Sequence, residues 1–224
     1  IVHPIENAVN AHVEGFSHSL GKPLKPLTLE NIQARERGNV LMAYAQEFAG
    51  MVVGNGNKTE FQRGYATLYG DLVGALMPLG DVHKLLVYAI GRHLDPHGDV
   101  LPQELYTLVP SAELSEQQDV TAGREDPFDY FIEAPMGVEL VENAKNPADL
   151  RLEFEKRALD PDLWIADHQG RIVYEKMDAA RFETYAIEVQ NAIARSFFKR
   201  VQSPPVPVVS PRAFGLDLHE TLFG

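Results

Sequence analysis

Apolar residues recur at helical spacing in three long segments of this sequence. These segments are residues 6–20, 28–48 and 178–200. Apolar side chains that lie three or four residues apart share one face of a helix, so the pattern predicts three amphipathic helices. Thr28 is a favourable residue for a helix N-cap, and Gly50 is typical of the position just after a helix ends.

Shorter patterns predict further elements between and after these helices. Asp81 is expected to cap a helix that ends at residues 95–98, where Asp-Pro-His-Gly is typical of a chain reversal. Residues 147–159 predict a short helix, and a small hairpin is expected around residues 168–170. The tail, residues 201–224, is too rich in proline for a helix and is expected to be extended.

Two short apolar runs predict strands. Residues 1–5 resemble the buried end of a strand, and residues 51–53 resemble a buried parallel strand that opens into a ligand-facing Gly-Asn-Gly loop. Helices that alternate with buried strands are typical of the α/β class, so we expect an α/β fold. Because the sequence starts within one of these apolar runs and without methionine, we also expect it to be part of a longer protein.

The composition is that of an ordinary globular protein. It serves mainly to exclude certain functions and kinds of site. The 224 residues carry a formal net charge of −12, which argues against a general binder of nucleic acid or anionic membranes, since phosphates select basic surfaces. The lack of cysteine excludes disulfides, zinc–thiolate sites, iron–sulfur clusters and cysteine nucleophiles. No bilayer-spanning segment or signal-peptide pattern is visible, so we expect a cytoplasmic location.

Several polar residues are candidates for a binding site, and each also has a purely structural interpretation. Asn31 and Arg35 share one helix face, where Arg35 could clamp a carboxylate or phosphate or could simply face solvent. Glu60 follows the Gly/Asn loop and could hold Mg²⁺ or favour a helix N-terminus. Asp71 could accept a hydrogen bond from a ligand or could belong to an ordinary turn.

Three further candidates lie later in the chain. Lys84 is near an expected helix N-terminus, where the dipole disfavours a cation, so it indicates either a negatively charged ligand or a local pair with Asp81. Ser111 could donate to a phosphate or cap a helix. Lys199 lies at the end of a long helix, where the dipole favours a cation without any ligand. The eight histidines show no spacing typical of a zinc site.

Six motifs occur in one order along the chain: ENIQARERGNVLMAYA, GNKTE, GYATLYGD, PLGDVHK, PSAEL and a C-terminal FKRVQSPP followed by SPRAFG. Together they resemble the synthetase domain of NAD+ synthetases, and the last motif resembles the glutamine-dependent kind in particular. The matches are dense over residues 28–94 and again from about 196 to 215. They are thin over residues 115–180.

The resemblance implies a fold and a division of the chain. The implied fold is the Rossmann-like adenine nucleotide alpha hydrolase fold, also called the N-type ATP pyrophosphatase fold, with part of it upstream of residue 1. Residues 1–200 would form the C-terminal part of this domain, with a lid or insertion at about 115–180. Residues 201–224 would form an extended C-terminal tail.

The resemblance also implies a reaction, in which deamido-NAD+ is amidated to NAD+. ATP adenylates the carboxylate of deamido-NAD+ with release of pyrophosphate, and ammonia derived from glutamine then displaces AMP. Mg²⁺ and cationic side chains would stabilise the charge that develops on pyrophosphate. A site closed to water would protect the acyl-adenylate from hydrolysis. The family further suggests a homo-oligomer, at least a dimer.

The same resemblance assigns the candidate residues to ligands. The residues implied to contact deamido-NAD+ are Asn31, Arg35, Glu60, Asp71 and Lys199. Asn55, Lys84 and Ser111 would face ATP, and Glu60 would also bind Mg²⁺. Asn55 and Ser111 each replace a threonine that is usual in the family, which keeps a polar group but leaves the role of Asn55 open.

One part of the family pattern is absent from these 224 residues. The phosphate-binding loop, of the form SGGxDS, does not occur in the sequence, and neither does the glutaminase domain. In the family this loop lies upstream of the position at which the sequence begins. We therefore predict that the 224 residues alone neither bind ATP tightly nor make NAD+. Two alternatives stay open: an ammonia-dependent synthetase, and a non-catalytic nucleotide-binding or assembly module that has lost the loop.

Overall fold

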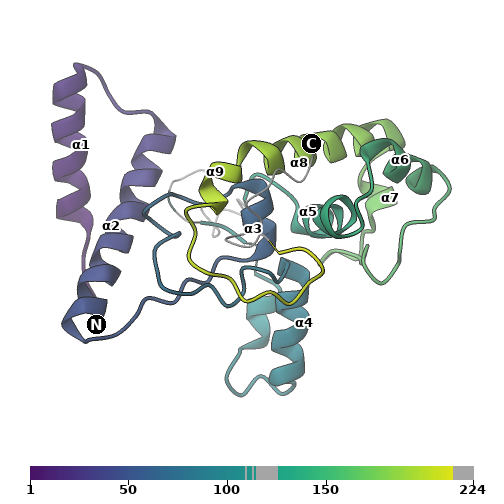
Figure 1. Cartoon of the computed structure of the whole chain (residues 1–224), viewed down its shortest axis with the longest axis horizontal. Helices are drawn as coiled ribbons and strands as arrows, with labels where there is room; N and C mark the ends of the chain where they lie inside the picture. The colour runs from purple at the N-terminus through teal and green to yellow at the C-terminus, as the bar shows by residue number, and fades with distance from the viewer. Residues whose placement is uncertain (109, 113, 115–125, 214–224) are drawn as a thin grey trace.

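The secondary structure of the chain is almost entirely helical in the computed structural model (Figure 1). The structure describes residues 1–108, 110–112, 114 and 126–213. In chain order the elements are α1 (Glu6–Leu20), α2 (Pro26–Glu47), α3 (Lys58–Arg63), α4 (Lys84–Leu94), the 3₁₀ helix η1 (Gln103–Tyr106), α5 (Tyr130–Gly137), the π-helical η4 (Val138–Glu142), α6 (Pro147–Glu155), α7 (Val173–Lys176), α8 (Ala179–Arg195) and α9 (Phe197–Arg200). Within the described residues, no helix is both long and apolar enough to cross a membrane.

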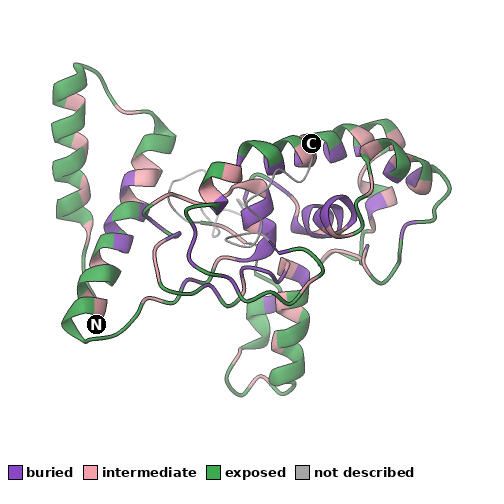
Figure 2. Ribbon diagram, viewed as in Figure 1, coloured by how far each residue is buried: buried purple, intermediate pink, exposed green. Residues whose placement is uncertain are grey.

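Helices α1 and α2 form a hairpin that stands to one side of the other helices (Figures 1 and 2). Within residues 6–20 of α1 no side chain is buried, whereas α2 buries Ile32, Ala34, Glu36 and Gly38. Both helices are confirmed, but α2 begins at Pro26 and not after Thr28. Proline is favourable in the first helical turn because it has no N–H to satisfy and its φ is already helical.

The prediction that two apolar runs form buried strands is wrong. Residues 1–5 are irregular and largely exposed. Near residues 51–53, one isolated parallel bridge joins Val53 to Leu76, with Gly54 N donating to Leu76 O at 2.9 Å. This bridge is the only β pairing in the described part of the chain. A short apolar run becomes a buried strand only where neighbouring strands satisfy its backbone groups and cover its side chains.

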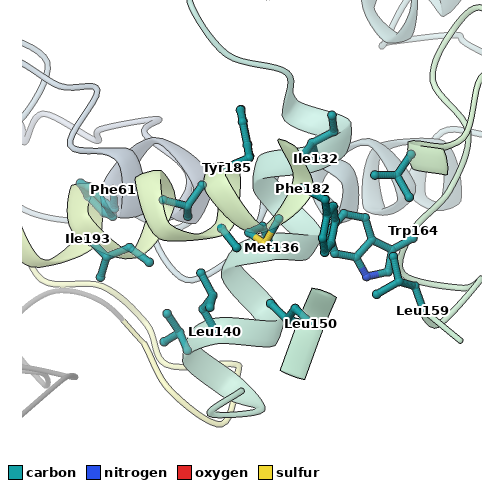
Figure 3. Packing of buried hydrophobic residues seen from close by; sticks show 14 of the residues in the cluster. Phe61, Ile132, Met136, Leu140, Leu150, Leu159, Trp164, Phe182, Tyr185 and Ile193 are labelled. Atoms are coloured by element: carbon teal, nitrogen blue, oxygen red, sulfur yellow. The ribbon is translucent and has the colours of Figure 1, made fainter. Parts of the chain in front are cut away.

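The hydrophobic core lies among α3, α5, α6 and α8 (Figure 3). The apolar stripe of α8 includes Phe182, which is fully buried. Its ring stacks on Phe154 of α6 at 4.5 Å between centroids and lies 5.4 Å from Trp164. The amphipathic helix predicted near the C-terminus is therefore confirmed as the element around which this core is built.

That C-terminal helix is interrupted, which the apolar spacing did not predict. The break is at Ser196, which separates α8 from α9. The Ser196 hydroxyl donates to the carbonyl oxygen of Ala192 at 2.7 Å, one turn earlier. A hydroxyl that bonds back in this way competes with the helix ladder and often bends the helix. The break separates α8 from the short helix α9, which carries Lys199.

The prediction that Asp81 caps the fourth helix is also wrong. α4 begins at Lys84, and its N-cap is His83, whose Nδ1 accepts from Leu86 N at 3.2 Å. The Asp81 carboxylate is occupied instead by Lys58 and by groups of Ser210. α6 is shorter than the predicted range 147–159.

No hairpin forms around residues 168–170, so that prediction is wrong as well. The chain makes a tight turn there, in which Asp167 Oδ1 accepts from the backbone N–H groups of Gln169 and Arg171 at 2.9 Å each. Helix α7 follows directly. A short aspartate side chain satisfies the same N–H groups that a strand partner would have used, so it favours the turn.

Candidate functional site

The Gly/Asn loop leads directly into α3, and its last residue determines how that helix begins. Asn57 Oδ1 accepts hydrogen bonds from the backbone N–H groups of Thr59 (3.0 Å) and Glu60 (3.2 Å). In return, Glu60 Oε2 accepts from Asn57 N at 2.9 Å. This capping box satisfies N–H groups that have no partner within the helix. It also fixes the Glu60 carboxylate beside the loop.

The other oxygen of the Glu60 carboxylate lies among tyrosine and charged side chains. The Tyr130 hydroxyl is 3.5 Å from Glu60 Oε1. Burial raises the pKa of Glu60 above its ordinary value, and the negative charges of Asp126 and Asp71 add to the rise. The capping-box N–H and the Lys84 ammonium oppose it. The three carboxylates of Glu60, Asp71 and Asp126 therefore outnumber the single ammonium of Lys84. This excess of negative charge favours the binding of a cation.

Asp126 is the member of this cluster that the sequence did not reveal. Its carboxylate is buried and accepts from the hydroxyls of Tyr65 and Tyr130, both at 2.9 Å, and from Ala112 N at 3.2 Å. Burial raises the pKa of Asp126 although these hydrogen bonds and Lys84 oppose the rise. The residue lies within the weakly matched stretch, residues 115–180, and no motif surrounds it.

Lys84 extends over aromatic rings in the first turn of α4. Its ammonium lies 5.5 Å from the centre of the Tyr88 ring and 5.4 Å from that of Tyr130. Its backbone N–H donates to Thr59 Oγ1 at 3.0 Å, which joins α4 to α3. The rings and the nearby carboxylates offset the unfavourable position of a cation at a helix N-terminus. Lys84 does not form the alternative local pair with Asp81, because Asp81 binds Lys58.

The second group of predicted residues converges on one loop, which we call the 64–71 loop. Thr67 Oγ1 donates to Asn31 Oδ1 at 2.7 Å, and Arg35 Nε donates to Leu68 O at 3.1 Å. Both partners come from one face of α2, as their spacing of four residues predicted. The polar face of α2 is therefore attached to this loop.

Lys199 reaches the same loop from α9. Its ammonium donates to the carbonyl oxygens of Gly64 and Ala66, each at 2.7 Å. Burial lowers the pKa of Lys199, and the negative charge of Asp71 opposes the shift. Asp71 itself closes the loop by accepting from the backbone N–H of Thr67. Four residues predicted for one ligand thus meet at one place, although they lie far apart in the sequence.

The loop can approach α9 this closely because residue 64 is glycine. Gly64 has a φ of 70°, in the left-handed region that favours glycine. A side chain at this position would also collide with the side chain of Ser196. The same serine that interrupts the long helix therefore lies against the start of the 64–71 loop.

Two of the predicted site residues remain, Asn55 and Ser111. Asn55 is exposed on the loop that precedes α3. Ser111 lies in irregular chain next to Ala112, whose N–H is bonded to Asp126, so it is near the acidic cluster. No helix begins at Ser111 in the described part of the chain, so the capping alternative is wrong there.

A cavity of about 290 Å³ is lined in part by Tyr88 and Tyr130, the two residues whose rings lie beneath the Lys84 ammonium. Aromatic side chains supply much of its wall, namely those of Tyr88, Phe128, Tyr130, Phe131 and His168. Phe131 and His168 meet edge to face at 4.9 Å between ring centres. Walls of this kind suit a flat aromatic ligand group.

The described residues do not build a metal site by themselves. Among them, no three or more histidine, aspartate or glutamate side chains come together in a way that could hold a metal ion. Mg²⁺ differs from zinc here, because it is usually bound through one or two protein carboxylates together with substrate phosphates and water. Glu60 fits that requirement, since it lies in an excess of negative charge.

Comparisons with known proteins show the family to which the chain belongs. The family model for NAD synthase matches residues 1–157 of the chain. The chain belongs to the NAD synthase family. The resemblance inferred from the six motifs is thereby confirmed.

The relatives identify the kind of synthase that the chain resembles. It is 30% identical over 217 residues to the glutamine-dependent NAD(+) synthetase of Thermotoga maritima, covering 96% of this chain and 32% of that protein. It is 32% identical over 190 residues to the same enzyme of Synechocystis, covering 84% of this chain and 29% of that protein. The chain thus spans about a third of the length of the curated relatives it matches.

A solved structure shows the same fold. The glutamine-dependent NAD(+) synthetase of Cytophaga hutchinsonii superposes with a TM-score of 0.65 at 17% identity. The superposition covers 89% of this chain and 29% of that one. The predicted α/β class, of the Rossmann-like ATP pyrophosphatase kind, is confirmed, although the described residues contribute mainly its helices.

Proposed function

We propose that these residues form part of a cytoplasmic enzyme that amidates deamido-NAD+ to NAD+ with ATP, using ammonia from glutamine. One observation carries this proposal: Asn31, Arg35, Asp71 and Lys199 converge on the 64–71 loop, beside the cluster of Glu60 and Lys84. The proteins that this chain resembles are named for this reaction.

The 64–71 loop would be the place where deamido-NAD+ is held. Arg35 and Lys199 supply positive charge for the phosphates of a dinucleotide, and Asn31 and Asp71 supply polar groups that can select its orientation. In the structure both cations donate to backbone carbonyls. Binding would exchange some of these hydrogen bonds for bonds to the ligand, so the loop is ordered before the ligand arrives.

The cluster of Glu60 and Lys84 would face ATP. Lys84 lies where a cation could stabilise negative charge that develops on the leaving pyrophosphate. Glu60 would hold Mg²⁺, which neutralises phosphate charge when it is bound. The aromatic cavity beside Lys84 suits a flat ring of a nucleotide, and Asn55 and Ser111 would add polar contacts near the phosphates.

Two further properties belong to the same proposal. The site would exclude water from the acyl-adenylate, which water would otherwise hydrolyse. The protein would act as at least a dimer, since the α1–α2 hairpin exposes large apolar side chains such as Phe16, Leu41 and Phe48.

The test measures NAD+ formation by the intact protein from deamido-NAD+, ATP and Mg²⁺, with glutamine or ammonia as the nitrogen source. Turnover with both sources supports the proposal. Turnover with ammonia alone points to the ammonia-dependent alternative. Absence of turnover with either source, together with binding of ATP, points to a nucleotide-binding module.

A substitution links the activity to the site. Lys84→Met keeps most of the length of the side chain and removes its charge, so we expect kcat to fall at least about tenfold. Lys156→Met is the control, because Lys156 is exposed at the end of α6. Equal kcat values for the two variants would contradict the role of Lys84.

A further inference from the structure

The chain after α9 crosses the molecule as an irregular strap, which we define as residues 203–212 (yellow in Figure 1). Its backbone accepts a hydrogen bond at Pro205 O from Met77 N at 2.9 Å. Its one apolar anchor in the core is Val206, which is 6% exposed and packs close to Gly80 and Phe61. The strap is therefore attached to the segment between α3 and α4.

Asp81 holds the far part of this strap. Its carboxylate accepts from the backbone N–H groups of Val209 and Ser210 and from the Ser210 hydroxyl, each at 2.7 Å. The same carboxylate pairs with the ammonium of Lys58 at 2.8 Å. Burial alone would raise the pKa of Asp81, but these hydrogen bonds outweigh it and lower the pKa, so the group is ionised at neutral pH.

Lys58 joins four separate parts of the chain. Its side chain is 3% exposed. Besides Asp81, the ammonium meets the Glu142 carboxylate at 2.8 Å, the Ser210 hydroxyl at 2.5 Å and the Arg212 carbonyl oxygen at 2.6 Å. Glu142 belongs to η4, which continues the helix that begins at Tyr130. One buried cation thus connects α3, the 81–84 segment, the α5–η4 helix and the strap.

These connections occur at the residues that set the geometry of the candidate site. Lys58 N also donates to Val82 O at 3.0 Å, and the next residue accepts from Lys84 N through its hydroxyl, Thr59 Oγ1, at 3.0 Å. Glu60 follows immediately. Two successive residues of α3 are therefore attached to residues 81–84, and the spacing of Glu60 and Lys84 depends on this attachment.

We propose that Lys58 is a positioning residue, whose buried ammonium uses the strap and Glu142 to hold Asp81 against α3 and so sets the placement of Glu60 relative to Lys84 and Tyr130. The residue does not touch the reacting groups itself. Its effect on turnover rests on the function proposed above, whereas its effect on the structure does not.

The test compares Lys58→Met with Lys145→Met in the intact protein. Lys145 is a suitable control because it also pairs with two carboxylates, Glu139 at 3.0 Å and Glu153 at 2.8 Å, neither of which is a partner of Lys58. For Lys58→Met we expect a folded protein whose kcat falls at least about tenfold, since small displacements of catalytic groups are costly. Lys145→Met should stay within about twofold of the unchanged protein.

Amide hydrogen exchange supplies a second readout that needs no activity. In Lys58→Met we expect faster exchange at the N–H groups of Lys84 and Ser210, and no such change in Lys145→Met. Unchanged protection of the Lys84 N–H, or equal kcat values for the two variants, would overturn the proposal. If the unchanged protein makes no NAD+, the proposed function fails, and the exchange measurement still decides the positioning role.

A milder variant covers the case in which Lys58→Met does not fold. Ser210→Ala removes the hydroxyl that joins Lys58 to Asp81 and leaves both charges in place. We expect this variant to fold and to show faster exchange at the Lys84 N–H, although the substitution lies on the strap. Protection at Lys84 equal to that of the unchanged protein would overturn the proposal.

Discussion

Glu60 illustrates how the candidate site combines two opposing requirements in one residue. The capping box holds its carboxylate in place, while burial and two neighbouring carboxylates make the ionised form unfavourable. A folded protein that contains such a group is less stable than it would be with a neutral side chain. This cost is typical of residues that are kept for binding.

We predict that Glu60→Gln stabilises the protein at neutral pH. Because the folded pKa of Glu60 is raised, its contribution to stability is fully present below the ordinary pKa of 4.5 and is lost as the pH rises through the folded value. The amide avoids this loss, so we expect a gain in the free energy of unfolding at pH 7 that shrinks as the pH falls toward 4.5. Denaturant unfolding at several pH values measures it.

The matched control for this variant is Glu14→Gln. It changes an exposed glutamate of α1 and should leave the free energy of unfolding nearly unchanged. Glu60→Gln should also abolish the proposed activity, since a neutral amide is a poor ligand for Mg²⁺. A loss of stability at pH 7 in Glu60→Gln would contradict the conclusion that burial disfavours the ionised carboxylate.

At the scale of elements, α8 supplies the face against which the other core helices pack. We predict that Phe182→Ala destabilises the protein by about 3–5 kcal/mol, because it removes a fully buried ring that contacts Phe154 and Trp164. The free energy of unfolding measures this loss. Ile187→Ala on the exposed face of the same helix is the matched control and should change stability by less than about 0.5 kcal/mol. Similar losses for both would contradict the position of the core.

The elements that the sequence predicted well are those with long apolar periods. The helices over residues 6–20 and 28–48 and most of 178–200 were predictable, because the spacing of their apolar side chains depends only on the local chain. The break at Ser196 was not, because a serine hydroxyl can bond to its own helix or to other groups. The strands failed because strand pairing depends on partners distant in the chain, which the local apolar spacing does not reveal.

The residues of the candidate site also divide into those that the sequence predicted and those that it did not. Asn31 and Arg35 were recognisable as one face because they are close in sequence, and the motifs supplied the rest by resemblance. Asp126 and Lys58 were missed because each also depends on a partner more than 60 residues away, Tyr65 for Asp126 and Glu142 for Lys58. A buried charge has no sequence signature of its own until the fold shows what surrounds it.

At the scale of the whole molecule, the most exposed part is the α1–α2 hairpin (Figure 2). We predict that Leu41→Asp weakens the proposed dimer of the intact protein, because Leu41 is 50% exposed on α2 and a buried charge at an interface is costly. Light scattering measures the mass of the particle. Gln46→Asp, which adds the same charge at an exposed polar position of α2, is the control. Equal masses for both variants would argue that the hairpin serves another purpose.

A second prediction at this scale concerns the 224 residues on their own. They contain the 64–71 loop and the Glu60 cluster but no SGGxDS motif, which the proposed function requires for holding the ATP phosphates. We predict that a protein made of these residues alone binds ATP weakly and forms no NAD+. Calorimetry with ATP and an assay with ammonia measure the two properties, and turnover by this shorter protein would refute the prediction.

The contacts of the 64–71 loop limit how related sequences can differ in length. Residues 64, 66 and 68 present carbonyl oxygens to Lys199 and Arg35, while Tyr65, Thr67 and Tyr69 bond to Asp126, Asn31 and Gln202. One inserted residue would move every later partner out of register with three different parts of the chain at once. Over evolutionary time, insertions and deletions should therefore accumulate before Gly64 or after Asp71, and this loop should keep a constant number of residues.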